Sequence, residues 1–101
     1  MTDDGRQPRR KPRARRHRIA IGNQRGLHAR AAALFVKTAS AFDAEVTVSK
    51  DAETVSGTSI MGLMMLAAGR GSEITLIATG PEAEQAIGAL SALIEANFQE
   101  E

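Results

Sequence analysis

One histidine in this chain stands at a position that favours phosphate chemistry. The run Gly26-Leu27-His28-Ala29-Arg30 follows a polar break that begins at Gly22, and it opens an apolar pattern with helical spacing. The first turn of a helix exposes unpaired N–H donors and a partial positive charge, and both attract phosphate. His28 can carry a phosphoryl group on a ring nitrogen there, while Arg30 holds the phosphoryl oxygens. The same spacing also fits a solvated histidine or an imperfect helix cap.

A second stretch, from Ser59 to Ala68, is apolar on two sides of a short predicted helix. The residues of one side are Leu63, Leu66 and Ala67, and those of the other are Ile60, Met61, Met64 and Ala68. A short helix on a single sheet face can bury only one of these sets. Methionine repacks easily, so an exposed set would suit the docking of several partners. Alternatively, Met64 and Met65 pack beneath the neighbouring helices.

The elements around these two stretches alternate between strand and helix. Strand-like alternation occurs at 19–21, 44–49, around Val55 and at 73–78, and helical spacing occurs at 27–42, 60–68 and 80–98. The predicted core faces of the first and last helices are Leu27, Ala31, Leu34, Phe35, Ala39 and Phe42, and Ala83, Ala86, Ile87, Leu90, Ile94 and Phe98. The order βαββαβα predicts an α+β fold, an open-faced two-layer β-sandwich whose four-stranded, mainly antiparallel sheet has three helices on one face.

Charge divides the chain into two parts. The 101 residues have a net charge of +1, but residues 1–18 carry +6 and residues 19–101 carry −5. The first segment has two prolines and no large apolar residue after Met1. We therefore expect a disordered basic arm over 1–18 and one domain over 19–101. The arm has no apolar region typical of a targeting signal. It is a solvated tail, the product of a start codon assigned too far upstream, or a charge-driven contact to nucleic acid or anionic lipid.

Composition excludes several classes of function. The absence of cysteine rules out disulfides, zinc knuckles and cysteine nucleophiles, and no apolar run is long enough for a transmembrane helix. We expect a cytoplasmic protein without membrane insertion.

His17 lies among arginines and is assigned no chemistry. Two histidines in different surroundings do not make a metal site, so no metal or cofactor is expected. The three phenylalanines all have helical core spacing, which disfavours base stacking and hence a nucleic-acid-binding module.

The histidine and serine stretches together resemble a known family. Gly26-Leu27-His28-Ala29-Arg30, followed about thirty residues later by Ser59-Ile60-Met61-Gly62, is similar to the histidine-containing phosphocarrier HPr of the bacterial phosphotransferase system. The similarity extends from residue 19 to about residue 98. It implies that His28 accepts a phosphoryl group on Nδ1 from phosphorylated enzyme I and passes it to an enzyme IIA histidine, with Arg30 assisting. It also implies a relay protein rather than a self-contained catalyst.

The resemblance further implies regulation and docking near Ser59. In the family the matching serine is phosphorylated from ATP by HPr kinase/phosphorylase, although serine is also a good helix cap by itself. Ile60, Met61 and Met64 are expected to face outward towards partners of a monomeric carrier. Two roles stay open, namely sugar transport with carbon catabolite regulation, or a mainly regulatory paralogue that controls carbon or nitrogen metabolism.

One residue departs from the family pattern. Family members usually carry proline directly after the arginine, and Ala31 stands there in this chain. Proline would fix φ near the helix start without removing a needed donor. We expect alanine to loosen the entry to the helix while the N–H groups and Arg30 remain in place.

Overall fold

The computed structural model describes residues 14–100. The predictions made for residues 1–13 and for Glu101 lie outside these residues. The elements follow the predicted order with one short addition at the end: β1 (Arg15–Ala20), α2 (Ala29–Ala39), β2 (Glu45–Lys50), β3 (Glu53–Ser56), α3 (Ile60–Met65), β4 (Glu73–Thr79), α4 (Ala83–Glu95) and the 3-10 helix η1 (Asn97–Gln99).

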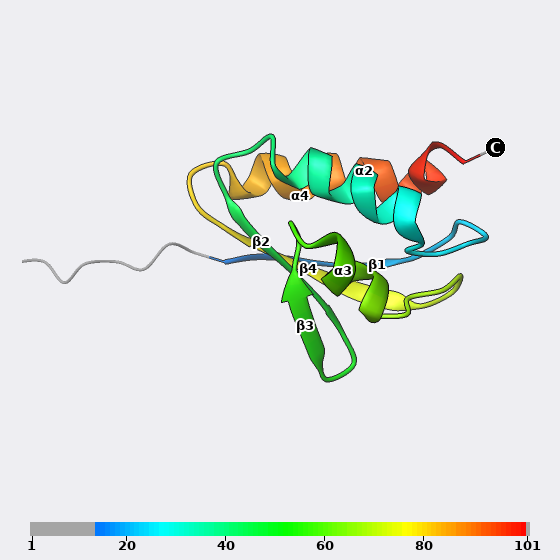
Figure 1. Cartoon of the computed structure of the whole chain (residues 1–101). Coiled ribbons are helices and arrows are strands. Elements are labelled where there is room, and N and C mark those ends of the chain that lie inside the picture. The colour runs from blue at the N-terminus through cyan, green and yellow to red at the C-terminus, as the bar shows by residue number, and fades with distance from the viewer. Residues whose placement is uncertain (1–13, 101) are drawn as a thin grey trace, which may run out of the picture.

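The four strands form one antiparallel sheet in the order β1-β4-β2-β3. Side chains alternate across it, so that Ile74, Leu76 and Ala78 of β4 are buried while Thr75 and Ile77 between them are half-buried. Helices α2 and α4 lie side by side, α4 packs on β1 and β4, and α3 packs against α2 and β3 (Figure 1). The predicted open-faced two-layer α+β sandwich with three helices is confirmed.

The core lies between the sheet and the helices. It is mostly aliphatic, because the chain has few aromatic residues, and a buried aliphatic side chain stabilises the fold by about 1.5–3 kcal/mol. The largest fully buried hydrophobic side chains are Phe35, Phe98, Ile21, Leu63, Leu66, Ile74, Leu76, Leu90, Ile94 and Val48.

The predicted boundary between arm and domain at residue 18 is wrong. Residues 15–18 are part of β1, which pairs with β4 from Arg15 opposite Ala78 to Ala20 opposite Glu73. The strand forms because its backbone groups are satisfied by the ladder with β4, which needs no apolar side chains. Charged side chains are common on edge strands, where they discourage pairing with other molecules. The basic cluster is therefore partly a strand of the domain.

All three helices end earlier than predicted, and α2 stops at Ala39, ahead of Phe42. Helix α3 stops at Met65, because Ala67 adopts a left-handed conformation (φ 55°) and the Ala68 carbonyl bonds outside the helix. Ala67 is exposed and Ala68 is buried, the reverse of the predicted faces. Phe98 is buried as predicted, but it lies beyond the end of α4. Within residues 14–100 no helix is long and apolar enough to cross a membrane.

Gly26 lies where the loop before α2 crosses the end of α3. Its φ is +65°, and a Cβ atom there would lie 2.4 Å from the Ala68 carbonyl oxygen. The next residue, Leu27, donates its N–H to that same oxygen at 3.0 Å. Only glycine permits this approach of the two backbones.

We predict opposite effects on stability for two glycine-to-alanine substitutions. Gly26→Ala should lower the free energy of unfolding by about 1–3 kcal/mol from backbone strain, with the contact to Ala68 adding to the loss. Gly88→Ala is the matched control, since Gly88 lies exposed in α4 with nothing within 4 Å of its Cβ position. It should raise the free energy of unfolding by about 0.5–1 kcal/mol. Urea denaturation measures both, and a Gly26→Ala protein as stable as wild type would contradict the argument.

Candidate functional site

His28 occupies the N-cap of α2, at the start of the helix as predicted. Its backbone is extended (φ −77°, ψ 178°), and its side chain makes no capping hydrogen bond. The first hydrogen bond of the helical type runs from the Ala32 N–H to the His28 carbonyl at 2.8 Å. The N–H groups of Ala29, Arg30 and Ala31 precede that bond, so the helix end next to the imidazole offers unpaired donors to an anion.

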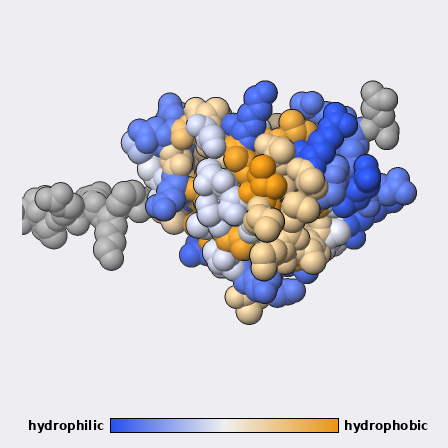
Figure 2. Space-filling view, in the orientation of Figure 1, coloured by the Kyte–Doolittle hydropathy of each residue, from blue (hydrophilic) through white to orange (hydrophobic). Residues whose placement is uncertain are grey.

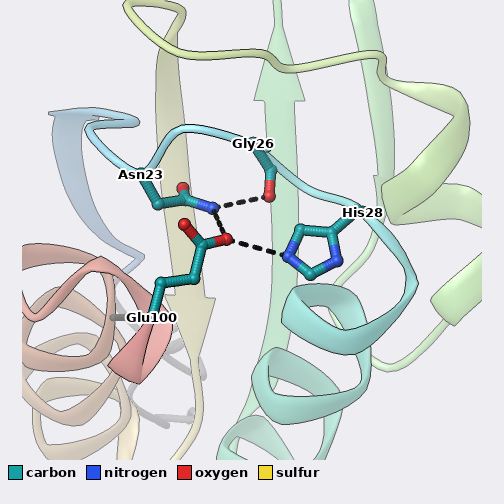
Figure 3. A network of polar contacts seen from close by, with 4 residues as sticks. All are labelled: Asn23, Gly26, His28 and Glu100. Carbon is teal, nitrogen blue, oxygen red and sulfur yellow. Dashed lines mark hydrogen bonds and ion pairs between the residues drawn. The ribbon is translucent and has the colours of Figure 1, made fainter.

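A polar network from the other end of the chain holds the imidazole (Figure 3). Glu100 Oε2 lies 3.0 Å from His28 Nε2, and Asn23 Nδ2 donates to the same oxygen at 2.8 Å. Asn23 Nδ2 also donates to the Gly26 carbonyl at 2.9 Å, and Asn23 is only 2% exposed. Neither Glu100 nor Asn23 is among the site residues predicted from the sequence. Asn23 lies within the polar break before the motif, but no local pattern brings Glu100 to a residue 72 positions earlier.

The network also acts on the charge of Glu100. The hydrogen bond from Asn23 holds the pKa of the Glu100 carboxyl below its ordinary value, while partial burial raises this pKa. A hydrogen bond from His28, the electrostatic attraction of its ring when that ring is protonated, and a backbone hydrogen bond from Gln24 lower the same pKa further. Glu100 is therefore ionised at neutral pH, when it can only accept hydrogen bonds.

Arg30 and Ala31 lie in the first turn of α2. Arg30 is exposed in this turn, two residues after His28. Ala31 is fully buried. Its N–H is among those ahead of the first helical hydrogen bond, so a proline there would break no backbone hydrogen bond within α2, although it would remove one of the three N–H groups at the helix end.

Ser59 is the N-cap of α3. Its Oγ accepts a hydrogen bond from the Gly62 N–H at 2.9 Å, and its side chain is half-buried. Gly62 packs closely here, since a Cβ atom would lie 3.1 Å from both Ser59 Oγ and Val55 Cβ. The interpretation of Ser59 as a helix cap is confirmed.

The outer side of α3 forms an exposed apolar patch. Leu63 and Leu66 are buried, as predicted for one side of the helix. The exposed residues, here named the α3 patch, are Ile60 (41%), Met61 (72%), Met64 (41%) and Met65 (74%). Figure 2 shows apolar surface gathered over this part of the molecule. Ile60, Met61 and Met64 thus face outward, and Met65, which was not among the predicted docking residues, joins them.

The imidazole and the α3 patch border one shallow hollow. His28 and Arg25 line it from the loop and the start of α2, and Met64 and Ala67 line it from the end of α3. Because Leu27 of the loop donates its N–H to the Ala68 carbonyl, a backbone hydrogen bond keeps the start of α2 next to the end of α3. A protein bound over the α3 patch would therefore also meet His28.

His17 lies apart from this site, exposed on β1. Its neighbour Arg18 forms an exposed ion pair with Glu73, a type of contact that contributes little to stability. No group of three histidine, aspartate or glutamate side chains in the described part of the chain could hold a metal ion.

The open-faced sandwich with a histidine at a helix mouth is the arrangement expected of a histidine phosphocarrier. A family model described as "PTS HPr component phosphorylation site" matches residues 15–96. The chain belongs to this family, the HPr phosphocarriers of the phosphotransferase system. The match begins at the first residue of β1, in agreement with the corrected domain boundary.

Individual relatives agree with this assignment. Phosphocarrier protein HPr of Neisseria meningitidis is 50% identical over 82 residues, which cover 81% of this chain and 92% of that protein. Phosphocarrier protein NPr of Shewanella violacea is 44% identical over 82 residues, covering 81% and 90%. The crystal structure of HPr from Thermoanaerobacter tengcongensis is similar with a TM-score of 0.83 at 48% identity, covering 86% of this chain and 98% of that one.

The Glu100 network predicts a pH-dependent contribution to stability. Since the folded-state pKa of Glu100 is lowered, its stabilisation is fully present above the ordinary glutamate pKa and is lost as the pH falls through the folded value. Glu100→Gln should therefore unfold more easily than wild type at neutral pH, and this difference should shrink in acid. Urea denaturation across the acid range measures it. Glu95→Gln, which removes an exposed carboxylate outside the network, is the control, and a difference for Glu100→Gln that does not change with pH would contradict the prediction.

Proposed function

We propose that this protein is a phosphoryl relay in which His28 accepts a phosphoryl group on Nδ1 from phosphorylated enzyme I and passes it to a histidine of an enzyme IIA component. The observation that carries the proposal is the position of His28, at the N-cap of α2 with no capping bond. Its ring is about one-fifth exposed (21%) and borders the hollow beside α3, where another protein can reach it.

The transfer is an in-line displacement between two imidazoles. A bond forms between His28 Nδ1 and phosphorus as the bond between phosphorus and the donor's ring nitrogen breaks, and the electron pair of that bond returns to the donor. The first N–H groups of α2 and the guanidinium of Arg30 neutralise charge on the phosphoryl oxygens during the transfer. Catalysis by such preorganised donors needs no metal bound to this chain.

The α3 patch is the proposed docking surface for both partners. It borders the same hollow as His28, so a partner that covers Ile60, Met61 and Met64 brings its own histidine towards Nδ1. Exposed methionine side chains adapt to different shapes, which suits a carrier that must bind a donor and an acceptor in turn.

Labelling tests the central step. Incubation with enzyme I and radioactive phosphoenolpyruvate should label the wild-type protein and the His17→Ala variant, because His17 lies on β1 away from the hollow. His28→Ala should remain unlabelled. Equal labelling of wild type and His28→Ala would refute the proposed role of His28.

Regulatory phosphorylation of Ser59 by HPr kinase/phosphorylase is a second part of the proposal. Ser59 immediately precedes Ile60 and Met61, so its hydroxyl lies at the edge of the α3 patch. A phosphate there adds about −1.5 to −2 charge beside an apolar docking surface. The modified protein should bind partners of that surface less well, or bind different ones. The kinase as partner rests on the family resemblance.

Two measurements test the role of Ser59. Incubation with HPr kinase/phosphorylase and labelled ATP should modify wild type but not Ser59→Ala. Ser59→Asp and Met61→Asp should both lower kcat/KM for phosphorylation by enzyme I, since each puts a negative charge on the docking surface. Gln85→Asp, exposed in the first turn of α4, controls for the added charge and should leave kcat/KM unchanged. A kcat/KM for Ser59→Asp and Met61→Asp equal to that of this control would exclude docking at the α3 patch.

The wider role of the relay stays a prediction. Sugar transport with carbon catabolite regulation, and mainly regulatory control of carbon or nitrogen metabolism, use the same chemistry at His28. They differ in which enzyme IIA component receives the phosphoryl group. The monomeric state and the cytoplasmic location likewise remain predictions from the resemblance and the sequence.

A further inference from the structure

The carboxylate of Glu100 contacts the reactive ring, and the relay chemistry described above does not use it. Its Oε2 lies 3.0 Å from His28 Nε2, and the two side chains are 19% and 21% exposed. Partial exclusion of water strengthens a hydrogen bond between such groups compared with a solvated pair. Figure 3 shows the carboxylate meeting the imidazole edge at Nε2, while the other ring nitrogen points away from it.

Asn23 holds this carboxylate in place. Its Nδ2 atom donates both to Glu100 Oε2 (2.8 Å) and to the Gly26 carbonyl (2.9 Å), so one buried amide ties the carboxylate to the loop that carries His28. The accepting oxygen is therefore fixed relative to the ring by two independent contacts.

The chain also turns sharply to deliver Glu100. Three successive residues, Asn97, Phe98 and Gln99, have positive φ values of 56°, 53° and 61°, which are uncommon for residues other than glycine. Such a turn persists only where the surrounding structure holds it. Phe98 anchors the turn, because its side chain is buried in the core and only 1% exposed. Burial of Phe98 thus directs the next residues back towards the start of α2.

A carboxylate opposite Nε2 decides which ring nitrogen carries the proton. Ionised Glu100 has no hydrogen to donate, so a hydrogen bond to it requires the Nε2–H form of the imidazole. In a neutral ring with its proton on Nε2, Nδ1 holds the free electron pair. Nδ1 is also the nitrogen that must attack phosphorus in the proposed relay.

We infer that Glu100 is a positioning residue for phosphoryl transfer: its carboxylate, held by Asn23, keeps the ring proton of His28 on Nε2 and leaves Nδ1 free to attack. The inference rests on the proposed function of His28. As Nδ1 bonds to phosphorus, the ring becomes a cation that retains its Nε2 proton, while the donor imidazole takes back the electron pair of the broken P–N bond. The negative charge of Glu100 compensates the ring cation at the Nε2–H.

The first measurement reads the ring proton directly and needs no partner protein. Long-range proton–nitrogen NMR correlation of nitrogen-15-labelled protein distinguishes the Nε2–H from the Nδ1–H form at a pH where the ring is neutral. Wild type should show the Nε2–H form almost alone. Glu100→Ala should raise the Nδ1–H population several-fold, because water then solvates either nitrogen. Glu100→Gln should keep the Nε2–H form, since Asn23 holds an amide oxygen in the same place.

The second measurement is the rate of phosphorylation by enzyme I. Glu100→Ala should lower kcat/KM about ten- to a hundred-fold, by analogy with the loss seen when a carboxylate that orients a metal-binding histidine is removed. Glu100→Gln should fall between this variant and wild type, because it keeps the acceptor but lacks the charge. Glu95→Ala, which removes an exposed carboxylate at the end of α4, is the matched control and should match wild type.

The outcomes separate the inference from the proposed function. A wild-type protein that enzyme I does not phosphorylate overturns the relay itself. If wild type is phosphorylated but Glu100→Ala leaves the ring tautomer of His28 unchanged, the positioning role is overturned. This holds even if the rate of phosphorylation falls, because Glu100 would then act through folding alone. A tautomer shift without any loss of rate also overturns it.

Discussion

The functional end of this molecule depends on one contact between two backbones, where the loop before α2 crosses the end of α3. The absence of a side chain at Gly26 lets the loop approach the Ala68 carbonyl, and Leu27 donates its N–H to that oxygen. This contact holds the residues that follow α3 against the loop that leads into α2. It therefore places the N-terminus of α2, with its unpaired N–H donors, beside the exposed apolar α3 patch. A protein that relays phosphoryl groups between other proteins needs both an anion-binding site and a docking surface.

The site combines three kinds of chemistry from three parts of the chain. The start of α2 supplies donors for phosphate, and α3 supplies an adaptable apolar surface with Ser59 at its edge. The C-terminal turn supplies a carboxylate at the far nitrogen of the ring. The antiparallel sheet brings these parts together, because α2, α3 and α4, which follow β1, β3 and β4, all lie in the same layer. None of the three parts alone would both orient the imidazole and present it to a partner.

Local sequence signals predicted much of this arrangement. The alternation in β2 and β4, the helical spacing from Leu27 and the glycine-bounded break before His28 are set by short-range patterns, and the structure follows them. The two faces of α3 were also predictable, because a helix on an open sheet can bury only one of them. The errors lie at element ends. Residues 15–18 were assigned to the arm because their side chains are charged, whereas backbone pairing with β4 makes them a strand.

The sequence by itself determined the family, the order of the elements and the position of His28 at a helix mouth, because these depend on residue types and spacing within short windows. The tertiary structure alone decided that Glu100 and Asn23 meet His28. Glu100 lies 72 residues away along the chain, and it arrives there only through the burial of Phe98 and the left-handed turn that follows α4. Contacts of this kind depend on packing between distant segments, which no local periodicity encodes.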